Sequence, residues 1–100
     1  MPEKHVVTYP AVLDDSENSP GQYTVTFPDV PSAISEEIGM YQALDRGAEA
    51  LELMLYDEKN LPVSTDLKSV EQQYPHAIVR LITVNLVAAR KKVTAPLLDA

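Results

Sequence analysis

The stretch Tyr23-Thr24-Val25-Thr26-Phe27-Pro28-Asp29-Val30-Pro31 decides how the rest of the chain is interpreted. Tyr23, Val25 and Phe27 alternate with threonines, and this period of two predicts a strand with one aromatic-rich face against a core. The two prolines then end the strand, because proline has no backbone N–H to donate and it restrains the residue before it. The stretch therefore predicts one strand of a sheet, followed by a tight loop.

An earlier strand and an acidic turn precede this stretch. The run from His5 to Leu13 is rich in valine and other strand formers, so we expect a strand there. Pro10 lies within it, and because proline cannot donate to a ladder, one side of this strand should be an edge or a bulge. Residues 14–21 read Asp-Asp-Ser-Glu-Asn-Ser-Pro-Gly, a turn composition that predicts an antiparallel pair.

A long amphipathic helix is predicted after a short third strand at about Ala33 to Ser35. Gly39 is the expected N-cap, with Gln42 bonding back to it in a capping box, and the helix should end near residues 57–60. One apolar stripe falls at helical spacing, and its small residues should let the helix approach the sheet closely: Met40, Ala43, Leu44, Gly47, Ala48, Leu51 and Leu55.

The remaining chain predicts a short helix and a last strand. Asp66 to Gln72 suits two helical turns capped by Thr65 or Asp66, and Ala77 to Ala88 reads as the longest strand. The resulting order is β-β-β-α-β, which is an α+β fold: an antiparallel sheet with one main helix packed on a face. Such a sheet has a free edge, which must be charged, covered or paired.

Composition restricts the class of protein. One hundred residues with 45% hydrophobic content fit one globular domain, and no cysteine is present for disulfides, metal sites or nucleophiles. No apolar run reaches the ~20 residues of a membrane helix, and the first residues lack a signal-peptide core, so a cytoplasmic protein is expected. Residues 1–89 hold five Lys or Arg and fourteen Asp or Glu, a charge of −9, which repels phosphate backbones and favours a basic partner.

No constellation of residues predicts an enzyme, and we expect no catalytic residue, cofactor or metal. The acidic turn lacks the order of a calcium loop, so a solvated turn is favoured over a metal site. His5 could act as a general base, but no serine, cysteine or carboxylate is placed by sequence to use it, and we expect both His5 and His76 to be surface or half-buried residues. Glu36 and Glu37, directly before the helix, are expected to complement its positive end.

One basic cluster, Arg90-Lys91-Lys92, is a candidate for nucleic-acid binding. Three charges without interleaved aromatic residues are a small signal for that function. We therefore divide the chain into a domain at 1–89 and a short basic tail at 90–100.

Five segments together resemble the HicB family of bacterial antitoxins: Tyr9-Pro10-Ala11-Val12, the stretch from Tyr23 to Pro31, Gln42-Ala43-Leu44, Ala48-Glu49-Ala50-Leu51-Glu52-Leu53 and Leu61-Pro62-Val63-Ser64. The resemblance covers about residues 4–88. It implies a partial ribonuclease-H-like fold, and an antitoxin that covers the active site of HicA, a small basic ribonuclease that cleaves messenger RNA. Many family members also carry a C-terminal DNA-binding segment, and residues 90–100 are too short for one, which makes DNA binding doubtful.

The resemblance and the charge together predict a protein-binding function. Candidate contacts with a HicA-like toxin lie in two acidic places, Asp14, Asp15 and Glu17 in one, and Asp29, Glu36 and Glu37 in the other. We also expect a homo-oligomer, because the last strand has more apolar residues than one small face needs. The alternative function is that of an orphan HicB-like transcriptional regulator or nucleic-acid-associated protein.

Overall fold

The alternating stretch forms strand β2 (Gln22–Thr26), inside a four-stranded sheet. The computed structural model describes residues 6–94, with β1 (Val6–Asp14), β3 (Ile34–Ile38) and β4 (Ile78–Asn85) completing the sheet. The strand order is β3-β2-β1-β4, and every neighbouring pair is antiparallel. The predicted α+β class with an antiparallel sheet is confirmed.

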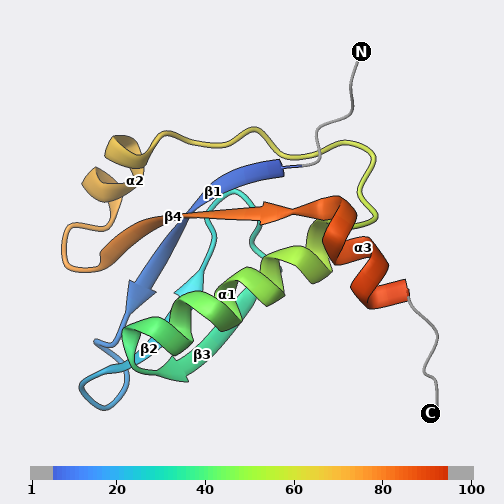
Figure 1. The fold of residues 1–100 in the computed structure, drawn as a ribbon. Coiled ribbons are helices and arrows are strands. Elements are labelled where there is room, and N and C mark those ends of the chain that lie inside the picture. Colours follow the sequence, from blue (N-terminus) through green and yellow to red (C-terminus); the bar gives the residue numbers. More distant parts are fainter. Residues whose placement is uncertain (1–5, 95–100) are drawn as a thin grey trace, which may run out of the picture.

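Helix α1 (Met40–Leu55) lies across one face of the sheet (Figure 1). It buries Ala43, Gly47, Leu51 and Leu55 against the inward residues of β1, β2 and β4. Met40, Leu44 and Ala48 flank this line as partly buried neighbours, so the predicted apolar stripe is confirmed. This stripe and the inward residues of the sheet form the larger of the two hydrophobic clusters in the described residues.

The start of α1 differs from the prediction. Gly39 is the N-cap, with a φ of +88° that favours glycine, but no side chain caps the helix. The Gly39 N–H donates to the carbonyl of Gly21 at 2.8 Å, so it is not available to Gln42. The predicted capping box is therefore wrong, because the residue before the helix is still tied to the sheet.

Helix α2 (Leu67–Gln73) packs on the opposite face, where Val70 joins Val12 and Val79 in a second, smaller cluster. Figure 1 shows α2 and α1 on opposite sides of β4. Asp66 is its N-cap: Oδ2 accepts from the Ser69 N–H at 3.0 Å and Oδ1 accepts from the Ser69 hydroxyl at 2.9 Å. The predicted two-turn helix and its cap are thus confirmed.

The Asp66 cap predicts an acid-dependent loss of stability. Its hydrogen bonds, first that from the Ser69 hydroxyl, lower the pKa of Asp66 below its ordinary value of 3.8. A lowered folded-state pKa gives a stabilisation that is present above the unfolded pKa and is lost as pH falls through the folded pKa. We expect Asp66→Ala to lower the thermal midpoint at about pH 7, and the deficit to shrink below about pH 4. Asp66→Asn should retain much of the cap without this pH dependence, and equal deficits for Ala at both pH values would contradict the assignment.

Two strands have other bounds than the sequence suggested. The third strand runs from Ile34 to Ile38 rather than from 33 to 35, so Glu36 and Glu37 lie within a strand and not in the loop before the helix. The last strand ends at Asn85, and α3 (Leu86–Thr94) follows it directly. The side chain of Asn85 accepts from the Ala88 N–H at 3.0 Å, which caps the new helix. The sequence division at 89/90 thus falls inside α3.

The register fixes which backbone groups face each edge. The Gly39 N–H donates to the Gly21 carbonyl, so residues 21 and 39 form a hydrogen-bonded pair and the adjacent pair, Gln22 and Ile38, is a non-hydrogen-bonded pair. Along an antiparallel strand, successive residues point their backbone N–H and C=O groups to opposite sides. When this alternation is followed from β3 through β2 to β1, the Pro10 nitrogen points toward the β2 side of β1. On that side, β2 pairs only with residues 12–14 of β1. Pro10 therefore interrupts no ladder bond. β1 is an inner strand rather than an edge strand, but its β2 side is unpaired at Pro10, which meets the requirement that the proline predicted.

Both outer strands have a free edge within residues 6–94. By the same alternation, the backbone N–H and C=O groups of residues 34, 36 and 38 point outward from β3, and those of residues 79, 81, 83 and 85 point outward from β4.

No helix in the described part of the chain is long and apolar enough to cross a bilayer.

Candidate functional site

The acidic turn between β1 and β2 is built by its own carboxylates. Asp14 Oδ1 accepts from the Ser16 N–H at 2.8 Å, and Asp15 Oδ2 accepts from the Gly21 N–H at 2.9 Å. The bond from the Ser16 backbone is the main cause that lowers the pKa of Asp14, so this carboxylate is charged at neutral pH. Asp14 and Asp15 thus shape the turn, while Glu17 is exposed on it.

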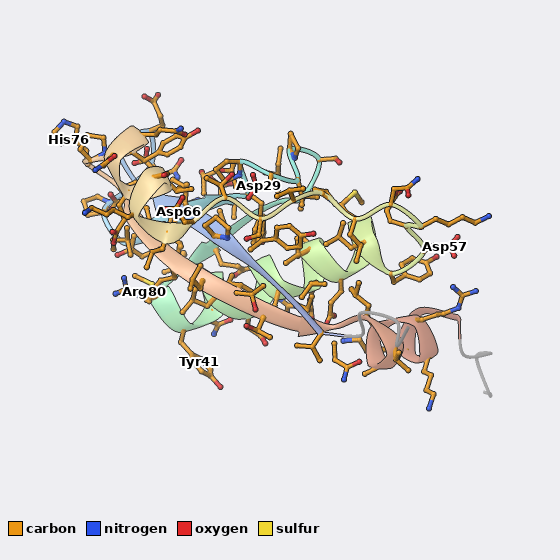
Figure 2. The ribbon with its side chains drawn as sticks, turned by 90° about the horizontal axis from the view of Figure 1, so that it is seen from above. Asp29, Tyr41, Asp57, Asp66, His76 and Arg80 are labelled. Carbon is orange, nitrogen blue, oxygen red and sulfur yellow. The ribbon has the colours of Figure 1, made fainter. Side chains whose placement is uncertain are left out.

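Asp29 has a structural role that the sequence did not indicate. Its two oxygens accept from the Thr65 N–H at 2.7 Å and from the Thr65 hydroxyl at 2.6 Å, which ties the loop after β2 to the segment before α2 (Figure 2). Tyr9 lies nearby and donates to the Pro62 carbonyl at 2.6 Å. Burial, and secondarily the charge of Asp29, raise the pKa of the Tyr9 hydroxyl. Asp29 therefore stabilises a long-range loop contact.

Glu36 and Glu37 point to opposite faces of β3, because successive side chains of a strand alternate. Glu37 faces α1, where its Oε2 lies 3.8 Å from Nε of Arg46, and Arg46 also contacts Glu49 at 2.8 Å. Glu36 faces the other side and forms no ion pair with any residue in the range 6–94. Of the two, Glu36 is the one whose charge is open to a partner.

The register brings part of the predicted acidic set together. Asp14 pairs with Thr24, and Thr24 pairs with Glu36, so the two carboxylates lie in one row on one face. Two inter-strand spacings of roughly 4.8 Å separate their backbones by about 10 Å. The turn with Asp15 and Glu17 adjoins the same end of the sheet. Asp29, at the far end of β2, and Glu37, on the α1 face, are not part of this group.

Exposed apolar side chains flank Glu36, and sequence reasoning did not select them. Ile34 is 60% exposed and Ile38 is 72% exposed, and both lie on the same face of β3 as Glu36. Tyr41, which follows on the first turn of α1, is 85% exposed (Figure 2). The spacing Ile34-x-Glu36-x-Ile38 was the available signal, because a period of two puts these residues on one face. We call Ile34, Glu36 and Ile38 the β3 surface.

Two of the three basic residues near the C-terminus contact carboxylates. Arg90 lies 3.1 Å from Asp57, and Lys92 lies 3.2 Å from Glu52, which fastens α3 to the end of α1 and the turn after it. Lys91 is exposed. Pairing reduces the positive potential that this cluster could offer a phosphate backbone.

The histidine and carboxylates within residues 6–94 do not assemble into a metal site. Among the described residues, no three His, Asp or Glu side chains come close enough together to hold an ion. His76 is exposed on the turn before β4, and His5 lies outside the described residues.

The sequence matches no protein-family model and no curated protein, whereas the fold matches solved structures. One is a chain of a toxin–antitoxin complex from Streptococcus pneumoniae, with a TM-score of 0.68 and 24% identity over 83% of this chain and 71% of that chain. Another is the N-terminal domain of the Burkholderia pseudomallei antitoxin HicB, with a TM-score of 0.63 and 20% identity over 79% of this chain and 99% of that chain. The HicB-like fold implied by the sequence resemblance is confirmed.

Proposed function

We propose that this protein is an antitoxin that binds a small basic HicA-like ribonuclease and silences it by covering its active site. The observation that carries the proposal is the shared fold with a chain of a toxin–antitoxin complex and with the HicB N-terminal domain. In this function the protein acts by binding in the cytoplasm, and it performs no catalysis itself.

The charge of the molecule supports a basic protein partner. Residues 1–89 carry a charge of −9, and the acidic turn and Glu36 expose carboxylates at one end of the sheet. A ribonuclease that binds messenger RNA must present positive charge at its active site, so an acidic surface complements it. The same acidity opposes the alternative function, an orphan regulator that binds nucleic acid through Arg90, Lys91 and Lys92.

Co-expression tests the proposal directly. A HicA-like toxin expressed alone should arrest growth and cleave RNA, and co-expression of this chain should restore growth. Glu58→Lys is a matched control, since Glu58 is exposed at the opposite end of α1 from the acidic turn, and it should rescue as well as wild type. Persistent arrest with both proteins folded and abundant would reject the antitoxin function and favour the regulator.

Charge reversal at Glu36 and Glu37 should slow association with the toxin. Complementary charges at the rim of an interface mainly accelerate encounter, so if these two carboxylates are rim charges, Glu36→Lys with Glu37→Lys should lower the association rate more than it raises the dissociation rate. A larger rise in the dissociation rate would place Glu36 inside the interface. Because Glu37 is already paired with Arg46, Glu36→Lys alone should account for most of the effect. Stopped-flow or surface plasmon resonance measurements at low and high salt give both rates. An unchanged association rate for the Glu36→Lys variant at low salt would contradict the prediction.

We further propose that two copies associate along the free edge of β4. Its outward backbone groups belong to Val79, Leu81, Thr83 and Asn85, so no carboxylate lies on this edge to repel a second copy. Leu81 is also 50% exposed there. Light scattering should give a particle heavier than the 11.0 kDa monomer at micromolar concentration, and Leu81→Pro should reduce it to the monomer. A monomer across the micromolar range would contradict this.

A further inference from the structure

The outer edge of β3 has unused hydrogen-bonding groups. The N–H and C=O of Ile34, Glu36 and Ile38 point away from β2, and no strand within residues 6–94 pairs with them. An uncovered edge of this kind is a template for one more strand. The residues whose backbone points outward are the same residues that form the β3 surface.

Along β3, the exposed side chains of the β3 surface alternate with partly buried side chains that face α1. This leaves one face of the strand open beside an added strand. Ser35 and Glu37 lie on the α1 face and are only partly exposed, while Ile34 and Ile38 expose most of their side chains. Glu36 lies between the two isoleucines on their face. A strand added here would meet an apolar, an acidic and an apolar position in turn.

A second copy of this chain is disfavoured at the β3 edge. Antiparallel pairing of two β3 strands about their centre would place Glu36 directly opposite Glu36, and like charges directly opposite destabilise a pair. The β4 edge carries no carboxylate, so it is the better place for self-association. The occupant of the β3 edge should instead carry positive charge opposite Glu36.

We propose that the β3 edge binds an extended segment of the toxin by strand addition. The segment has the pattern apolar-x-Lys/Arg-x-apolar: its cation lies opposite Glu36, and its apolar residues cover Ile34 and Ile38. This inference rests on the proposed function and names the contact through which the antitoxin holds its partner. Backbone bonds then supply affinity, and the three side chains of the β3 surface supply specificity.

Proline at position 36 separates the backbone contact from the charge. Glu36→Gln removes only the charge, whereas Glu36→Pro also removes an outward N–H without breaking a bond to β2. With a purified HicA-like toxin inactivated at its catalytic histidine as the probe, Glu36→Pro should dissociate about tenfold faster than Glu36→Gln. Leu81→Pro is the matched control, because it removes an outward N–H from β4, the other edge strand. The affinity of this variant for the toxin, counted per protomer, should equal that of wild type.

Amide hydrogen exchange of the wild-type complex gives a second, mutation-free test. Residues 35 and 37 bond to β2 in the free protein, so their amides should exchange slowly with or without toxin. The amides of residues 34, 36 and 38 should be unprotected in the free protein and protected in the complex. Strand addition would be overturned if the toxin binds without protecting the amides of residues 34, 36 and 38, or if the Glu36→Pro and Glu36→Gln variants dissociate at the same rate. Neither result would contradict the antitoxin function. Absence of wild-type binding would instead overturn the proposed function, and this inference with it.

Discussion

Leu51→Ala is expected to lower the free energy of unfolding by ~2–5 kcal/mol. Leu51 is 0% exposed and packs between α1 and the sheet, so truncation leaves a cavity that the surrounding core can fill only in part. Domains of this size are stable by only ~5–15 kcal/mol, so the loss is a large fraction of the total. Urea titration followed by circular dichroism measures it.

Leu53→Ala is the matched control for this prediction. It removes the same atoms from the same helix, but Leu53 is 53% exposed, so the change should be well under half as large. Glu49→Ala, on the polar side of α1, should change stability by less than about 1 kcal/mol. Equal losses at positions 51 and 53 would show that α1 presents a different face to the sheet.

Gly47→Val is expected to destabilise the fold by ~1–3 kcal/mol or more. A Cβ at position 47 would lie 2.9 Å from Cγ1 of Val25, which is too close for a side chain unless Val25, the sheet or the helix moves. Cδ1 of Ile82 would lie at an ordinary contact distance of 3.6 Å, so the further methyls of valine would have little free space. The absence of a side chain at Gly47 is what lets α1 approach β2. Thermal or urea unfolding measures the loss.

Two further variants test the cause of that loss. Asp45→Val introduces the same β-branched residue at an exposed position of α1, away from the sheet. It therefore tests the residue type without the close contact, although it also removes a charge that interacts with Arg46, and it should cost less than about 1 kcal/mol. Val25→Ala removes the methyl that the new side chain would meet. The double variant should therefore be more stable than the sum of the single changes predicts, and strict additivity would contradict the close approach.

The strongly periodic elements were predictable from the sequence. β2 and α1 each bury one face, and burial of a single face forces a period of two or of 3.6 on the residues. Pro10 predicted an unpaired side of β1, and Asp66 predicted the start of α2, because each satisfies a backbone requirement that is local in sequence.

β3 and α3 were harder to predict from the sequence, for physical reasons. β3 is an edge strand with only one covered face, so it tolerates Glu36 and Glu37 side by side, and that pair resembles the first turn of a helix. The residues before α3 are β-branched, and only the Asn85 cap and the following Ala-Ala-Arg-Lys-Lys distinguish the helix from more strand.

The acidic composition of the candidate site was predictable, but its arrangement was not. Asp29 is held by Thr65, thirty-six residues later, and Glu37 is held by Arg46 of the helix. Contacts between residues so far apart depend on the packed fold. Only the register of β1, β2 and β3 shows that Glu36 shares a face with Asp14 and with the two exposed isoleucines.

Inhibition of a purified HicA-like ribonuclease tests the central claim most directly. Cleavage of a labelled messenger RNA is followed while this protein is added in increasing amounts at low salt. The antitoxin function predicts that cleavage falls in proportion to the added protein and stops at a fixed stoichiometric ratio. Undiminished cleavage in the presence of a large excess of folded protein would contradict it.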